Sequence, residues 1–216
     1  MQADKKVVVL IGALSRDTSS GIGGVRYAIR SLLDSPLSQH LTWELIDATV
    51  TVGTPLLRRA WMAINRVLKL IFLLIIKRHI KTVFVFGGYD LTSFAEKGLM
   101  IILSKLFGKR TVFSVRTEIR PYSYDRWFVT FRRWVVKHCD VIICQSQIAA
   151  ASLSAQTGCA PEKICVLMNW VFADRYVKPA PTLDDPDDEA HVFTYIFVGH
   201  LTENKAPDVL IESAKL

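Results

Sequence analysis

The chain has 216 residues, 50% of them hydrophobic, and carries a formal net charge of +7 at pH 7. This length and apolar content suffice for a buried core and exclude an intrinsically disordered chain. Lys and Arg outnumber Asp and Glu by 27 to 20, which favours an anionic partner: a phosphate compound, a nucleic acid or a lipid surface.

The opening stretch predicts a buried strand, a glycine-rich loop and a helix. Residues 7–11 are consecutive apolar residues, typical of a parallel strand covered on both faces. Glycines at positions 12, 21, 23 and 24 precede a helical pattern over 25–33. The loop either contacts a phosphate or a sugar at the helix start, or simply makes turns. Arg26 occupies the third glycine position of a dinucleotide fingerprint, which counts against an NAD site.

A long basic amphipathic helix is predicted over 57–76, after a second strand at 41–46. Residues 48–89 contain seven basic residues, Arg66 among them, and no acidic ones. An apolar stripe recurs at spacings of three and four: Leu57, Trp61, Ile64, Leu68, Ile71, Phe72 and Ile75. Either the stripe packs on the sheet and the bases are solvated, or the helix lies on a membrane with its bases against anionic headgroups.

The middle of the chain alternates between strand and helix patterns. Strands are predicted at 82–86, 111–115, 141–144 and 163–168, and helices at 91–107, 124–139 and 148–157. This alternation predicts an α/β fold with a doubly wound parallel sheet, in which ligands bind beyond the carboxyl ends of the strands. Several polar residues fall at those ends: Asp47, Asp90, Arg116, Glu118, Ser146 and Asn169.

The composition changes after the sixth strand and predicts three segments. Residues 1–178 form the first, Rossmann-like domain, and residues 179–191 form an acidic, proline-rich linker. Residues 192–216 start a second domain, with a strand at 193–198 and a helix beginning at Pro207. One strand and one helix cannot bury a core, so we expect this second domain to be incomplete.

The four cysteines predict neither disulfides nor a metal site. Cys139, Cys144, Cys159 and Cys165 form no C-x-x-C pair and have no zinc-ligand spacing with the histidines. We interpret all four as small buried hydrophobic residues in a reducing compartment. The apolar run after Lys6 lacks a cleavage pattern, so a cytoplasmic protein is expected.

Three segments together resemble one enzyme family. Residues 21–25 read Gly-Ile-Gly-Gly-Val after the first strand, and residues 166–171 read Val-Leu-Met-Asn-Trp-Val. Residues 197–211 hold Phe-Val-Gly-His-Leu followed by Lys-Ala-Pro-Asp-Val-Leu-Ile. In order and spacing these segments resemble the family-4 glycosyltransferases of the GT-B architecture, which have two Rossmann-like domains facing across a cleft.

The resemblance implies transfer of a sugar from a nucleotide-diphosphate sugar to a saccharide or lipid-linked acceptor, with retention of configuration and without a metal or cofactor. The basic surface and the helix at 57–76 would suit an acceptor at the bilayer, which predicts a role in polysaccharide or glycolipid synthesis for the cell envelope, on the inner face of the membrane. Gly23, Gly24, Arg116 and Glu118 would contact substrate. His200, where the family has Arg, and Lys205 would hold the donor diphosphate; no catalytic residue is assigned.

Other interpretations stay open. The family's Glu-x7-Glu donor pair is missing, so we expect these 216 residues alone to be inactive. A truncated or degenerate protein that binds a membrane or a partner without catalysis is the alternative. An NAD- or SAM-dependent enzyme rests only on the alternating pattern, and no recognisable module supports a nucleic-acid partner. Arg116 and Glu118 are also consistent with a surface ion pair.

Overall fold

The computed structural model describes residues 5–14, 24–51, 53–88, 91–116, 126–168 and 207–213. The chain divides into two units, Met1–Phe172 and Ala173–Leu216. Helix α7 (Pro207–Ser213) is the described part of the second unit, and it begins at the proline that the sequence predicts. The predicted linker at 179–191 and strand at 193–198 lie outside the described residues.

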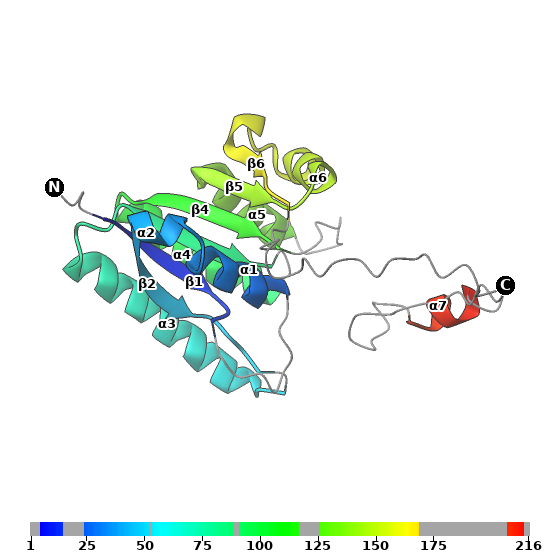
Figure 1. The fold of residues 1–216 in the computed structure, drawn as a ribbon, viewed down its shortest axis with the longest axis horizontal. Helices are drawn as coiled ribbons and strands as arrows, with labels where there is room; N and C mark the ends of the chain where they lie inside the picture. The colour runs from blue at the N-terminus through cyan, green and yellow to red at the C-terminus, as the bar shows by residue number, and fades with distance from the viewer. Residues whose placement is uncertain are drawn as a thin grey trace, which may run out of the picture. The chain divides into compact units, whose positions relative to one another are not determined.

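The described part of the first unit contains one sheet of six parallel strands in the order β2-β1-β3-β4-β5-β6 (Figure 1). The strands are β1 (Lys6–Gly12), β2 (Leu41–Asp47), β3 (Thr82–Gly87), β4 (Arg110–Val115), β5 (Val141–Cys144) and β6 (Ile164–Val166). The predicted α/β fold with a parallel sheet is therefore confirmed. The direction of chain progression reverses beside β1, which is where such sheets bind ligands.

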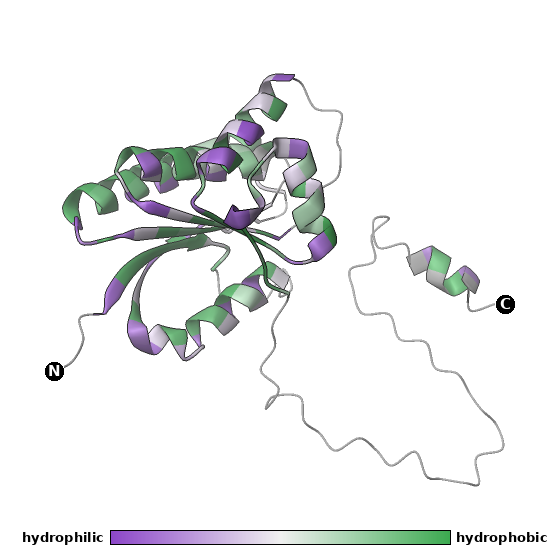
Figure 2. Cartoon of the chain, turned by 90° about the horizontal axis from the view of Figure 1, so that it is seen from above, coloured by the Kyte–Doolittle hydropathy of each residue, from purple (hydrophilic) through white to green (hydrophobic). Residues whose placement is uncertain are grey.

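Helices cover both faces of the sheet (Figures 1 and 2). They are α1 (Gly24–Leu33), α2 (Leu37–His40), α3 (Leu56–Ile76), α4 (Leu91–Leu106), α5 (Arg126–His138) and α6 (Gln147–Thr157). The step from β1 to β2 runs opposite to the later steps, so right-handed crossovers place α1 on the other face from α3 to α6. The short helix α2 was not predicted.

The core follows the alternation of side chains along the strands. Val9 and Ile11 join a large apolar cluster on the side of α3 to α6. Leu10, between them, belongs with Phe86 and Ile29 to a smaller cluster beneath α1. Both faces of β1 are thus covered, as its unbroken apolar run predicts.

Glycine at the end of β1 has a packing role. A Cβ at Gly12 would lie 2.4 Å from the Cδ1 atom of Ile29 and 3.2 Å from the Cβ atom of Phe86. The missing side chain therefore allows α1 to approach the sheet closely. Gly12 is a structural residue at the entrance of the predicted glycine-rich loop.

The apolar stripe on α3 does not face the sheet. The inward side of α3 carries Arg66, Leu70 and Leu74, which are buried. Trp61, Leu68 and Phe72 of the stripe are more than half exposed, and so are most of the other stripe residues. The interpretation that the stripe packs on the sheet is wrong, because three residues one turn apart on the opposite side of the helix make that contact. Within the described residues, no helix is both long and apolar enough to cross a bilayer.

Three of the four cysteines are buried as predicted. Burial raises the pKa of the Cys139 thiol to about 12 and that of Cys144 to about 11, and Cys159 is also buried. The prediction is wrong for Cys165, which is exposed at the centre of the edge strand β6. Because side chains alternate along a strand, this position faces away from the large cluster that Ile164 joins.

Candidate functional site

Asp47 organises the carboxyl edge of the sheet. It lies opposite Gly12 in the register of β1 and β2. Its Oδ1 atom accepts hydrogen bonds from the backbone amides of Leu14 at 3.0 Å and Thr49 at 2.9 Å, and from the Thr49 hydroxyl. Burial acts to raise the pKa of Asp47, but these hydrogen bonds and the charge of Arg66 outweigh it and hold that pKa below the usual value. The carboxylate therefore fixes the backbone where the chain leaves β1.

Arg116 is a buried cation at the same edge. Its backbone amide donates to the Gly87 carbonyl at 3.1 Å, and its Nε atom donates to the Ser114 hydroxyl at 2.9 Å. Its guanidinium carbon lies 5.3 Å from the ring centroid of Phe86. With 8% of the residue exposed, Arg116 is not the surface residue that one interpretation assumed. Burial lowers its pKa, yet a guanidinium remains charged at neutral pH and can bind phosphate or sugar oxygens.

Gly24 is the other predicted site residue that the structure describes. It is the first residue of α1, it is exposed, and a Cβ atom there would meet nothing within 4 Å. Packing among the described residues therefore does not require a glycine at this position. The predicted site residues Gly23, Glu118, His200 and Lys205 lie outside the described residues, as do Asp90 and Asn169.

Ser146, also predicted at this edge, has a local structural role. It is the N-cap residue of α6, and its hydroxyl accepts a hydrogen bond from the Ala149 amide at 3.1 Å. Such a cap satisfies an amide that the helix itself leaves unpaired. This contact explains the serine without a ligand.

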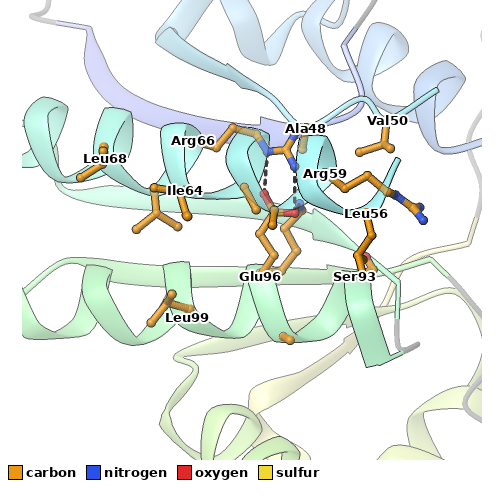
Figure 3. Close-up of a pocket in the computed structure, with 15 residues that line it drawn as sticks. Ala48, Val50, Leu56, Arg59, Ile64, Arg66, Leu68, Ser93, Glu96 and Leu99 are labelled. Atoms are coloured by element: carbon orange, nitrogen blue, oxygen red, sulfur yellow. Dashed lines mark hydrogen bonds and ion pairs between the residues drawn. The ribbon is translucent and has the colours of Figure 1, made fainter. Parts of the chain in front are cut away.

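A pocket of about 680 Å³ lies between α3 and α4 and reaches the segment after β2 (Figure 3). Residues 56–68 of α3 and 93–99 of α4 supply most of its walls, and Ala48 and Val50 complete them. In Figure 3, Val50, Leu56 and Arg59 lie toward one end, and Leu68 lies toward the other. The sequence does not reveal this pocket, because its walls come from helices separated by a strand.

A buried ion network crosses the middle of the pocket. Glu96 accepts hydrogen bonds from Arg66 Nε at 2.6 Å and Arg66 Nη2 at 3.2 Å, and it lies 3.0 Å from Lys97 Nζ. The sequence-based prediction that Arg66 is solvated is wrong: its side chain is 8% exposed. The sequence held one sign that Arg66 is buried. Arg66 lies one helical turn before Leu70 and two turns before Leu74, and both of these residues face inward.

A family model described as Glycosyltransferase Family 4 matches residues 36–175. The chain belongs to this glycosyltransferase family. The match covers β2 to β6 and helices α3 to α6, so the edge around Arg116 and the α3–α4 pocket both lie inside it. No curated protein sequence matches the chain significantly.

Solved glycosyltransferase structures resemble this family-4 chain at low sequence identity. A glycosyltransferase from Rickettsia africae is 14% identical, with a TM-score of 0.52, over 82% of this chain and 47% of that protein. HepE from Anabaena in complex with UDP-glucose is 15% identical, with a TM-score of 0.49, over 80% of this chain and 46% of HepE. The Rickettsia likeness supports the fold alone. The chain spans about half the length of the solved proteins it matches.

Proposed function

We propose that the protein containing this chain transfers a sugar from a nucleotide-diphosphate sugar to an acceptor held by the first unit. The observation that carries this proposal is the family match over residues 36–175, a range that contains β2 to β6 and their carboxyl ends. The buried cation Arg116 at that edge supports it, because a departing nucleoside diphosphate carries negative charge that a fixed cation stabilises.

We assign the remaining roles by the family resemblance. Gly23, Gly24, Arg116 and Glu118 contact substrate, and His200 and Lys205 hold the donor diphosphate. The reaction retains the configuration of the sugar and uses neither a metal ion nor a cofactor beyond the donor. Residues 1–178 form the acceptor domain, and residues 192–216 contribute to a donor domain, so the first unit alone does not turn over the donor.

The proposed setting is polysaccharide or glycolipid assembly at the cytoplasmic face of a membrane. The exposed apolar stripe of α3 supports this setting, since Trp61 and Phe72 point away from the sheet. Exposed bases on the same helix, Arg58 and Lys69, suit anionic headgroups. A protein that binds the membrane without catalysis would use the same surface, so the test of the proposal is sugar transfer.

The experiment measures sugar transfer by the protein purified at its natural length. UDP-glucose, the compound in the HepE crystal, is the first of several donors to test, each with saccharide and lipid-phosphate acceptors. We expect release of nucleoside diphosphate and labelled product, and a loss of about 100-fold in kcat/KM for Arg116→Ala. Arg110→Ala, at the exposed opposite end of β4, is the matched control. The proposal would be contradicted if no donor released nucleoside diphosphate, or if Arg116→Ala had the same kcat/KM as the original protein.

A further inference from the structure

The pocket between α3 and α4 is an apolar groove that small side chains keep open. Ala60 and Ala63 of α3 and Ala95 of α4 lie in its walls, so the two helices leave space between them. Ile64 and Leu68 extend these walls to the exposed stripe of α3. Its volume of about 680 Å³ suits a small ligand. An apolar chain could therefore enter it from the surface of α3.

The two ends of the groove differ in character (Figure 3). Arg59, which is exposed, lies toward the end formed by Val50, just after the carboxyl end of β2. Leu68 and Leu99 extend in the other direction, and both are partly exposed. The end near the sheet's carboxyl edge therefore carries the cation Arg59, and the rest of the lining is apolar apart from Ser93 and the ion network of Arg66, Glu96 and Lys97.

The charges around the groove select an anionic headgroup. Its described lining contains the cations Arg59, Arg66 and Lys97 and the single carboxylate Glu96. Arg66 and Glu96 bond each other in a bidentate pair, so this part of the wall does not need a polar ligand. No acidic residue occurs in the sequence over 48–89, which includes α3. A phosphate beside Arg59 would thus meet no repulsion from that segment.

We propose that this groove binds the chain of a membrane-derived lipid phosphate, with the phosphate beside Arg59, and that this lipid is the sugar acceptor. This inference rests on the proposed function and names its acceptor class: a phosphate oxygen of the lipid forms a bond to the anomeric carbon of the sugar. The bond from that carbon to the donor diphosphate breaks, and the nucleoside diphosphate leaves with the bonding electron pair. The polarity of the groove places the headgroup at the edge where Arg116 lies and the chain toward Leu68 and Leu99. The exposed stripe of α3 places the open side of the groove against the bilayer from which the lipid comes.

The test measures binding of farnesyl phosphate to the 216-residue chain by calorimetry, without a donor. Ala63→Trp fills the groove and should weaken binding at least tenfold. Ala151→Trp, at an exposed position of α6, is the matched control and should bind like the original chain. Arg59→Gln should weaken farnesyl phosphate binding several-fold and leave farnesol binding unchanged. Equal affinities of the Ala63→Trp and Ala151→Trp variants would overturn the proposal.

A second measurement covers the case in which Ala63→Trp fails to fold. A farnesyl phosphate analogue with a diazirine at the far end of its chain is photolysed with the unmodified chain. We expect cross-links on peptides that contain Leu68 or Leu99, and cross-links confined to other helices would overturn the proposal. This assay needs no sugar transfer, so absent diphosphate release contradicts the proposed function separately. Groove binding without transfer to any lipid phosphate overturns the acceptor role.

Discussion

Glu96 joins two helices through one carboxylate. It pairs with Arg66 of α3, and the two side chains are 13% and 8% exposed. Removing one partner of a buried pair leaves the other charge uncompensated, so we expect Glu96→Gln to lower the free energy of unfolding by about 3 kcal/mol. Glu44→Gln is the control, because its pair with Lys77 is more exposed and should cost less than about 1 kcal/mol. Urea unfolding measures both, and equal losses would count against the buried network.

The carboxylate of Asp140 makes the stability of the fold depend on pH. Its carboxylate accepts hydrogen bonds from Lys105 Nζ at 2.8 Å and from the Thr111 amide at 2.7 Å. Burial acts to raise the pKa of Asp140, but these hydrogen bonds and the charge of Lys105 outweigh it and lower that pKa below 3.8. Because the folded-state pKa is the lower one, the carboxylate stabilises the fold above pH 3.8, and this contribution is lost as the pH falls through the folded-state value.

We therefore expect Asp140→Asn to lower the free energy of unfolding by about 1–2 kcal/mol at pH 7. The difference from the original chain should shrink steadily below pH 4, since the original then loses the same interaction. Denaturant titrations at a series of pH values measure this. A difference that stays constant down to pH 2 would show that the ionised carboxylate is not the cause.

At the scale of elements, α4 and α5 pack closely at one glycine. A Cβ at Gly98 would lie 3.0 Å from the Phe131 ring and 3.2 Å from the Cγ2 atom of Val135. Gly98→Val should therefore push the helices apart and lower the free energy of unfolding by about 1–3 kcal/mol. Gly24→Val, at an open position of α1, should change it by less than about 0.5 kcal/mol. Thermal unfolding compares the two, and similar losses would contradict the close packing.

The outward stripe of α3 predicts peripheral membrane binding. Trp61 and Phe72 belong to the stripe but do not line the α3–α4 pocket, so they test the membrane separately from the lipid site. Replacing both by Ser should weaken binding to vesicles of equal parts phosphatidylcholine and phosphatidylglycerol by about tenfold or more. Replacing Arg58 and Lys69 by Gln should weaken it most at low salt. Ile148→Ser, at an exposed position of α6, should have no effect, and unchanged binding of both α3 variants would refute the membrane contact.

At the scale of the whole molecule, the two described apolar clusters lie entirely in the unit Met1–Phe172. We therefore expect this unit to stay folded without the rest of the chain. Limited proteolysis should first cut within the acidic, proline-rich linker that the sequence predicts at 179–191, and leave a fragment of the first unit that unfolds cooperatively in calorimetry. Early cleavage inside β3 or α4 would contradict a self-contained first unit.

Most of the fold could be predicted because its elements follow local patterns. The strands β1, β3 and β5 are short apolar runs, and the structure places them within one residue of the predicted ends. The helix predicted over 91–107 ends at Leu106, and Gly108 follows it with a φ of +68°, while the Lys109 amide donates to the Ser104 carbonyl at 2.9 Å. The strand β6 is shorter than predicted at both ends: the 3₁₀ turn Pro161–Lys163 includes its first predicted residue, and the strand stops before Leu167 and Met168.

Of the candidate site, the sequence located Arg116 and Gly24 at the carboxyl edge but not the groove between α3 and α4. Residue types and the strand ends suffice to locate Arg116 and Gly24, because parallel strands share one carboxyl edge. Arg66 shows why the groove could not be predicted. Its pairing with Glu96 joins positions 30 residues apart, and no local pattern encodes that contact.

The sequence by itself determined the parallel α/β sheet, the positions of its strands and the resemblance to family-4 glycosyltransferases. Hydrophobic periodicity and glycine positions are patterns of neighbouring residues, so they can be recognised without knowledge of tertiary contacts. Only the tertiary structure decided which side of α3 is buried. A helix with apolar residues on two sides can pack by either, and the choice depends on what the sheet and α4 present to it. Here Leu70, Leu74 and the ion-paired Arg66 fit that surface, so the larger apolar stripe is left facing outward.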